Sequence, residues 1–195
     1  MRRRLGSVAA TAALVVAAWV VHELDATSWQ LQAPFPVDGR PGEPLTGRNI
    51  SAVVLPDGAA PRTADILEID GTQVDEVRTS GVFLLIPVAA ATVIEPERLQ
   101  SVELEIDGRR YSRLANRLDY DDPWGAPLEP GIRTRAEVVF EVPPEVLRQA
   151  GSGRLELATA ADVSLDSVLQ VHIGLGDLEH AERVAPAEPV REAAP

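Results

Sequence analysis

The sequence predicts an all-β protein, a β-sandwich of seven to eight strands that is preceded by a single N-terminal transmembrane helix. Short apolar or alternating runs recur along the 195-residue chain, and Pro, Gly and Asp separate them. Helical periodicity is almost absent after residue 21. An apolar content of 45% in a chain of this length is enough for one domain with one hydrophobic core.

The first element is the uncharged apolar run of residues 5–21, which follows a basic start at residues 1–4. As a helix these 17 residues would span roughly 26 Å, about the thickness of a thin bilayer. The arginines of the basic start hold residues 1–4 in the cytoplasm, so the rest of the chain is translocated. A transmembrane anchor is favoured over a signal peptide because the run is long and lacks a clean cleavage site. Both interpretations localise the body on the extracytoplasmic side of the cell membrane.

Residues 22–44 are predicted to be a Pro- and Gly-rich spacer, and residues 45–178 the sandwich. Two strands are expected first, at residues 49–55 and 63–69, because each ends at an Asp-Gly turn signal. Residues 81–92 (GVFLLIPVAAAT) are continuously apolar. This pattern is typical of a central strand that is covered on both faces.

The clearest hairpin signal is Asp107-Gly108, between expected strands at residues 99–106 and 109–114, because both turn positions need positive φ. Residues 133–142 alternate, with every second residue from Ala136 to Val142 apolar, and Pro143 ends the strand. One helical turn at 145–149 and strands at 154–159 and 165–173 complete the predicted body. Residues 179–195 are rich in Pro, Ala and charge and are predicted to be a disordered tail.

Three stretches resemble a known family. They are GVFLLIPVAAAT at the place of its central strand, SVELEIDGRRYSR at its Asp-Gly hairpin, and LEPGIRTRAEVVFEVPPEV at its hallmark segment. In the hallmark segment the matching residues are Pro130, Gly131, Val139, Phe140, Val142 and Pro143. The family is the immunoglobulin-like domain of unknown function of bacterial secreted or membrane-anchored envelope proteins, akin to immunoprotective extracellular antigens. The resemblance covers roughly residues 47–173 and implies an extracellular sandwich without known catalytic residues. The chain departs from it in lacking the Asn that usually ends the central strand and a lipidated cysteine.

The charge of the chain excludes nucleic acid as a partner. The formal net charge is −12, and beyond the three arginines of the basic start 15 basic residues face 30 acidic ones. Phosphate binding needs a basic surface, so this body repels nucleic acid. The absence of cysteine also excludes disulfides and cysteine metal clusters.

One loop carries the candidate site residues. Asp119, Asp121 and Asp122 are close enough in sequence to offer oxygen ligands to Ca²⁺, although the spacing lacks the Gly and distal Glu of an EF-hand. Tyr120 and Trp124 flank this cluster, and aromatic residues in loops often anchor interfaces. The alternatives are that the aspartates belong to a solvated turn and that the aromatics cap the open end of the sandwich.

Other catalytic patterns are weak. His22, His172 and His180 share no metal-ligand spacing, and the sequence contains neither a G-x-S-x-G motif nor a glycine-rich phosphate loop. The sequence therefore favours a non-catalytic, membrane-tethered interaction module of a bacterial envelope, without a cofactor, that binds an unidentified protein partner. The alternative is an extracytoplasmic metal-dependent ligand binder or enzyme that uses the Asp119–Asp122 loop.

Overall fold

The structure, a computed structural model, describes residues 16, 19–20, 33–69, 75–114 and 122–194. In the N-terminal unit the described residues Val16, Trp19 and Val20 are helical. No helix among the described residues has the length and apolar character needed to cross a bilayer. The predicted anchor at residues 5–21 lies almost entirely outside them.

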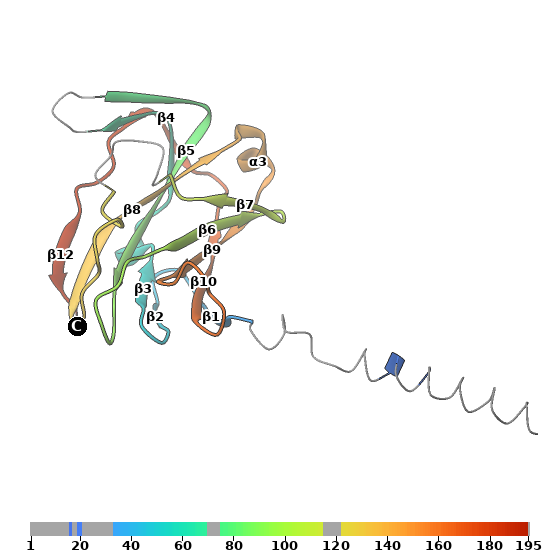
Figure 1. Cartoon of the computed structure of the whole chain (residues 1–195). Helices are drawn as coiled ribbons and strands as arrows, with labels where there is room; N and C mark the ends of the chain where they lie inside the picture. Colours follow the sequence, from blue (N-terminus) through green and yellow to red (C-terminus); the bar gives the residue numbers. More distant parts are fainter. Residues whose placement is uncertain (1–15, 17–18, 21–32, 70–74, 115–121, 195) are drawn as a thin grey trace, which may run out of the picture. The chain divides into compact units, whose positions relative to one another are not determined.

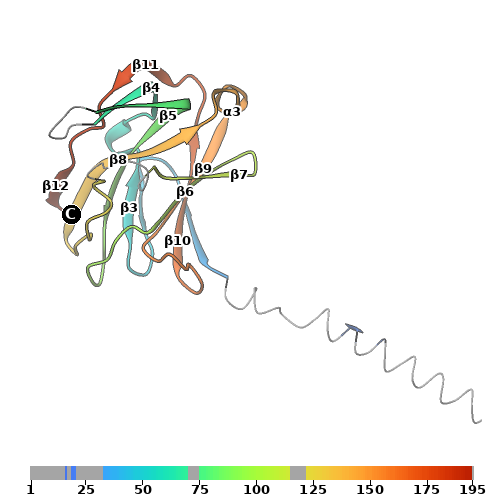
Figure 2. The same cartoon turned by 45° about the horizontal axis from the view of Figure 1, so that its top comes forward.

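Residues 34–195 form a second unit, which contains two β-sheets. Sheet A has the order β1 (Phe35–Gly39), β10 (Ser167–Gly174), β9 (Ser152–Ala158), β6 (Ser101–Ile106) and β7 (Arg109–Ser112). Sheet B is built around the long strand β5 (Asp75–Ala91), which pairs with β8 (Ile132–Val142), β4 (Arg62–Ile69) and β3 (Ser51–Val54). Its outer strands are β2 (Pro44–Thr46), β11 (Glu179–Val184) and β12 (Val190–Ala193). Figures 1 and 2 show the two sheets as layers of a β-sandwich.

The main core lies between the two sheets. Sheet A contributes buried leucine, valine and isoleucine side chains from alternate positions of β6, β9 and β10, and sheet B contributes those of β5 and β8. On β8 the inward residues are Ala136, Val138, Phe140 and Val142, as the alternation predicts. Each fully buried side chain of this size contributes about 1.5–3 kcal/mol relative to an exposed one. The burial of apolar area therefore fixes the register of the two layers.

A second apolar cluster covers the other face of sheet B. It joins Phe83 and Leu85 of β5 and Val139 of β8 with Val184 of β11, and Leu114 packs against it. Phe83, Leu84, Leu85 and Ile86 are all fully buried. The prediction of a central strand covered on both faces is confirmed, and β11 supplies part of the cover.

A proline in the centre of sheet B explains a break beside β5. Leu55 donates its N–H to the carbonyl of Pro87 at 2.9 Å, and the N–H and C=O of one residue in an antiparallel pair point to the same side. An N–H at position 87 would therefore face the same side as this carbonyl, and Pro87 has none to donate there. Here β3 ends, the short 3-10 helix η1 (Pro56–Gly58) intervenes, and β4 then resumes pairing with β5.

Eight predicted strands correspond to β3–β10, and Asp107 and Gly108 have φ of 49° and 75°, as the predicted hairpin requires. The helix α3 (Pro144–Gln149) follows β8 at the predicted place. The described residues hold twelve strands, however, so the predicted count of seven to eight is too low. The additional strands are β1, β2, β11 and β12.

Two domain boundaries are therefore wrong. The predicted spacer at residues 22–44 contains β1, which pairs in parallel with β10. The predicted disordered tail at residues 179–195 contains β11, which pairs in parallel with β4, and β12, which pairs with β8. These segments lie at sheet edges, where only one side of the strand pairs, so a proline is tolerated when the N–H that it lacks would face the open side. A Pro-, Ala- and charge-rich composition therefore did not prevent pairing.

Candidate functional site

One end of the sandwich, at which β8 and β10 finish, carries a hollow. We call this the distal end. The hollow has a volume of about 610 Å³ and is lined by β4, by α3 and by the segment between β10 and β11. Its apolar lining includes Val82, Leu147 and Leu178, and its charged lining includes Arg148 and Asp177. Ligand sites commonly combine an apolar lining with a few polar groups in this way.

A histidine in this hollow lies between a hydroxyl and a carboxylate. His180 on β11 places Nδ1 at 3.2 Å from Thr63 Oγ1 and Nε2 at 3.5 Å from Asp65 Oδ2. Asp65 lies at a β-bulge of β4, where the register shifts between Ala64 and Ile66.

The hydrogen bonds do not activate the threonine as a nucleophile. Thr63 Oγ1 donates its single proton to the carbonyl of Glu179 at 3.2 Å, so it accepts from Nδ1 of His180. Neutral His180 then carries no proton on Nε2, and its attraction to Asp65 requires the protonated ring. Both His180 and Asp65 are about half exposed. The arrangement is suited to binding polar groups of a ligand.

A smaller hollow of about 440 Å³ adjoins the first, and the two share Pro144. Ser80, Tyr111 and Glu145 line it. It extends the recessed surface along α3, so that a ligand larger than one side chain has two adjacent places to occupy.

The predicted acidic loop is only partly described. Asp119, Tyr120 and Asp121 lie outside the described residues. Asp122 is an ion-pair partner of Arg113, with Oδ2 at 3.1 Å from Nη1, and its Oδ1 accepts the N–H of Trp124 at 3.2 Å. Burial lowers the pKa of Arg113 below its usual value, and Asp122 partly opposes this effect. Within the described ranges no three His, Asp or Glu side chains are grouped closely enough to hold a metal ion.

Trp124 is not a contact residue of an exposed surface. It is 1% exposed, belongs to the main core, and donates its indole N–H to the carbonyl of Glu137 at 3.1 Å. The prediction that Trp124 binds a partner is therefore wrong. Its burial is compatible with the alternative, that the aromatics cap the open end of the sandwich.

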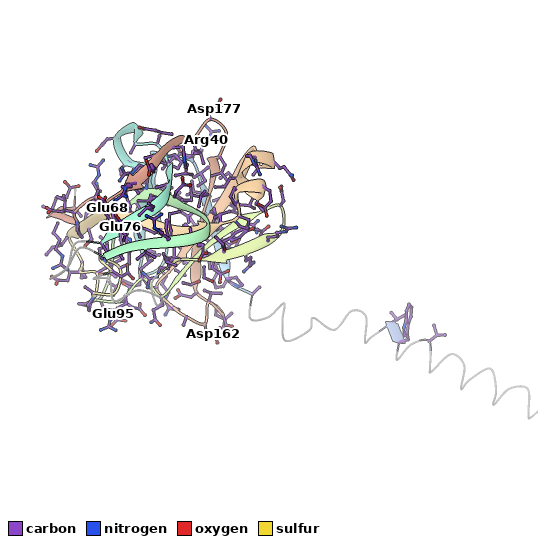
Figure 3. The ribbon with its side chains drawn as sticks, turned by 90° about the horizontal axis from the view of Figure 1, so that it is seen from above. Arg40, Glu68, Glu76, Glu95, Asp162 and Asp177 are labelled. Carbon is purple, nitrogen blue, oxygen red and sulfur yellow. The ribbon has the colours of Figure 1, made fainter. Side chains whose placement is uncertain are left out.

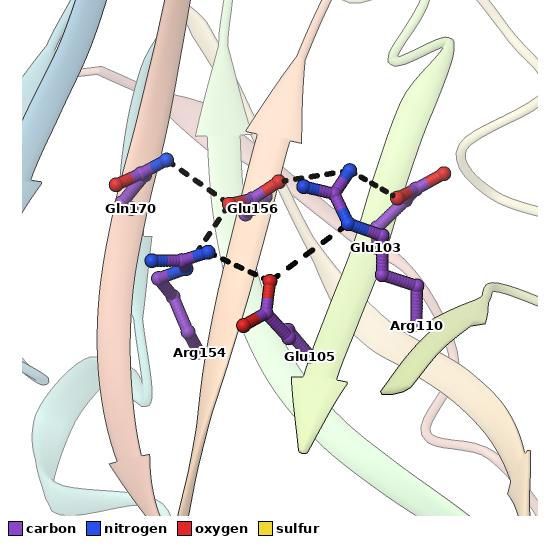
Figure 4. A network of polar contacts seen from close by, with 6 residues as sticks. All are labelled: Glu103, Glu105, Arg110, Arg154, Glu156 and Gln170. Atoms are coloured by element: carbon purple, nitrogen blue, oxygen red, sulfur yellow. Dashed lines mark hydrogen bonds and ion pairs between the residues drawn. The ribbon is translucent and has the colours of Figure 1, made fainter. Parts of the chain in front are cut away.

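A network of charges covers the outer face of sheet A (Figure 4). It joins Glu103 and Glu105 of β6, Arg110 of β7, Arg154 and Glu156 of β9 and Gln170 of β10. The shortest contact is the 2.7 Å between Arg154 Nη2 and Glu105 Oε2. Gln170 Nε2 donates to Glu156 Oε1 at 3.0 Å. Opposite charges on facing strands stabilise a sheet, so this network links four strands and has no need of a ligand.

Sequence reasoning missed both the hollow and the network. The alternating Glu103, Glu105 and Arg154, Glu156 indicate one polar face on each strand, but only the strand register shows that they meet. The hollow has no sequence signal, because its walls come from segments that are far apart in the chain.

The described part of the chain is thus a β-sandwich protein with a recessed distal end. No family model matches the chain, and no curated protein matches it. Among solved structures it is similar to an uncharacterized β-sandwich protein from Clostridium difficile 630, with 14% identity and a TM-score of 0.44. The similarity covers 71% of this chain and 95% of the other. The β-sandwich assignment here rests on the two sheets and their common core.

Proposed function

We propose that the protein is a non-catalytic interaction module of a bacterial envelope, tethered to the cytoplasmic membrane by residues 5–21 and exposed on the extracytoplasmic side. The hollow at the distal end is the observation that carries the binding role. The uncharged N-terminal run behind three arginines supports the tether.

The chemistry of the hollow supports a protein partner. An apolar floor that includes Leu147 and Leu178 can receive an apolar side chain, and burial of such an anchor supplies much of the affinity at an interface. Arg148 and Asp177 at the hollow offer one charge of each sign to the groups beside that anchor. Together these groups set the orientation of an inserted loop.

An immunoglobulin-like topology is part of the same proposal. The chain passes repeatedly between the two sheets, with β1 in sheet A, β2–β5 in sheet B, β6 and β7 in sheet A and β8 in sheet B. Such crossovers between two packed sheets are typical of the immunoglobulin-like sandwich. The resemblance of residues 47–173 to the envelope-protein family supports this topology.

The tether is tested with an alkaline phosphatase fused to the C-terminus of the full chain. We expect phosphatase activity in intact cells, and we expect Leu14→Arg to abolish it because a charge at the centre of a membrane span opposes insertion. A reporter that works only in the cytosol would overturn the extracytoplasmic assignment.

The binding role is tested by crosslinking from single cysteines, which the cysteine-free chain allows. A photoreactive thiol label on Gly176→Cys, which lines the hollow and has room for a side chain, should capture one defined membrane protein. Leu178→Asp should abolish this capture. Arg109→Cys, at the exposed first position of β7, is the matched control. Equal capture from both positions, or none from Gly176→Cys, would contradict a partner site at the hollow.

A further inference from the structure

Exposed apolar side chains gather at the end of the sandwich opposite the hollow. Among the described residues 34–194, five large apolar side chains are exposed. Four of them are Phe35, Val93, Ile94 and Leu165, with exposed fractions of 59%, 45%, 67% and 51%. They lie where β1 begins, after the end of β5 and before the start of β10. We call this the proximal end.

Hydrogen bonds between these segments place them side by side. Phe35 donates its N–H to the carbonyl of Asp166 at 2.8 Å, which joins β1 to the loop that carries Leu165. Arg48 donates its N–H to Ser167 Oγ at 2.9 Å. The next residue, Asn49, accepts the N–H of Ile94 on its side-chain oxygen at 2.9 Å.

Asn49 holds the turn that presents Ile94 rigidly. Its Oδ1 also accepts the N–H of Glu95 at 3.1 Å, and its Nδ2 donates to the carbonyl of Glu95 at 3.2 Å. Nδ2 donates further to Glu97 Oε2 at 3.0 Å. Both the donor and the acceptor atom of the Asn49 amide are therefore hydrogen-bonded, and these bonds hold the turn in which Val93 and Ile94 are exposed.

Leu165 adopts a backbone conformation that its side chain does not favour. Its φ is 57°, in the left-handed region, where Gly or Asn is usual and a branched side chain is strained. The leucine is nevertheless half exposed, so the strain is not offset by burial in the core. Strain kept at an exposed apolar residue points to a role outside the fold.

We propose that the proximal end rests on the outer surface of the cytoplasmic membrane, with Phe35, Ile94 and Leu165 inserted into the lipid interface. This inference rests on the proposed tether. Thirteen residues separate Val21 from Phe35, and a chain of that length spans at most about 50 Å when fully extended. The proposed tether would therefore keep the start of β1 within that distance of the bilayer and raise its effective concentration there.

The charges at this end define which lipid suits it. Figure 3 shows Glu95 and Asp162 on the same side of the view, away from Asp177, and Asp166 follows Leu165 in the chain. In the loops that carry Ile94 and Leu165, these carboxylates and Glu97 outnumber the single arginine, Arg98, so this end repels an anionic surface. We therefore expect insertion to be strongest in zwitterionic phosphatidylcholine and to weaken as phosphatidylglycerol is added at low salt.

The test uses the full chain in phosphatidylcholine vesicles, with an environment-sensitive fluorophore on single cysteines. Ile94→Cys and Leu165→Cys report on the proximal end, and Asp177→Cys is the matched control at the distal end. We expect emission at shorter wavelength and loss of fluorescence with spin-labelled lipid at positions 94 and 165. Neither change is expected at position 177.

A second variant separates insertion from folding. A probe on Phe35→Cys should lose its lipid quenching when Ile94→Asp and Leu165→Asp are added, while the urea midpoint stays unchanged because both side chains are exposed. If the protein floats with the vesicles while all probes report water, this proposal is overturned and the tether stays intact. The proximal end would then be free for a protein partner. Failure of the protein to float with vesicles would overturn both.

Discussion

Arg62 of β4 and Glu137 of β8 form a bidentate ion pair across the central strand β5. Nε donates to Oε1 at 3.0 Å and Nη2 donates to Oε2 at 2.9 Å. The pair also binds the C-terminal segment, because Glu137 Oε2 accepts the N–H of Ala187 at 2.8 Å and Arg62 Nη2 donates to the carbonyl of Ala185 at 3.2 Å. These two side chains therefore hold residues 185–187 in place. This segment joins β11, which pairs with β4, to β12, which pairs with β8.

Glu137→Gln should destabilise the fold and release this segment. The Glu137 side chain is only 6% exposed, and loss of its charge leaves Arg62 facing a neutral amide. We expect the free energy of unfolding to fall by about 1–3 kcal/mol in urea titrations. Hydrogen exchange at Ala187 should accelerate as well.

Glu103→Gln is the matched control, because the pair that Glu103 makes with Arg110 is more exposed. The control should cost about 0–1 kcal/mol. An equal loss in the two variants would show that the Arg62–Glu137 pair contributes no more than a surface pair.

Trp124→Phe should also lower the free energy of unfolding. The change removes the indole N–H that Glu137 O accepts and leaves a small void in the main core. The expected loss is about 1–3 kcal/mol. A Trp19→Phe/Trp29→Phe chain isolates the emission of Trp124, which should be blue-shifted and resist acrylamide quenching. Emission at the wavelength of exposed tryptophan would contradict its burial.

The sequence predicted those parts of the fold in which side-chain pattern and burial agree. The alternation of residues 133–142 specified the inward face of β8, and Asp107-Gly108 specified the β6–β7 hairpin. β1, β2, β11 and β12 were missed because an edge strand needs a neighbouring ladder and not an apolar pattern. That neighbour is known only once the sheets are assembled.

The candidate site was harder to predict. The clustered charges and aromatic residues of one loop predicted a site at residues 119–124. In the structure, Asp122 is paired with Arg113 and Trp124 is buried. The hollow brings Thr63 and His180 together through the parallel pairing of β4 and β11. A local pattern cannot show such a contact, because it depends on how the last strands return to the sheet.

Gly81→Ala should destabilise the junction of β5 and β8. A Cβ at Gly81 would lie 2.7 Å from the carbonyl oxygen of Val142, a backbone atom that cannot move without the strand. We expect a loss of about 1–3 kcal/mol in the free energy of unfolding. Gly174→Ala is the matched strand control, because no atom lies within 4 Å of a Cβ there. That change should be neutral or stabilise by up to about 1 kcal/mol, and similar losses in both variants would contradict the steric argument.

Arg154→Met should reveal the electrostatic part of the network on sheet A. Arg154 lies 2.7 Å from Glu105 and 3.1 Å from Glu156, whereas Arg110 lies 3.8 Å and 3.9 Å from the same carboxylates. Without Arg154 these two carboxylates repel each other with only the more distant guanidinium between them. The expected loss is about 1 kcal/mol at low salt, because the pairs are partly exposed. It should shrink in about 1 M NaCl, where the screening length is roughly 3 Å. Arg109→Met, at the exposed first position of β7, should change the stability by less than about 0.5 kcal/mol at either salt concentration. A loss from Arg154→Met that does not depend on salt would instead assign the role of Arg154 to packing of its aliphatic stem.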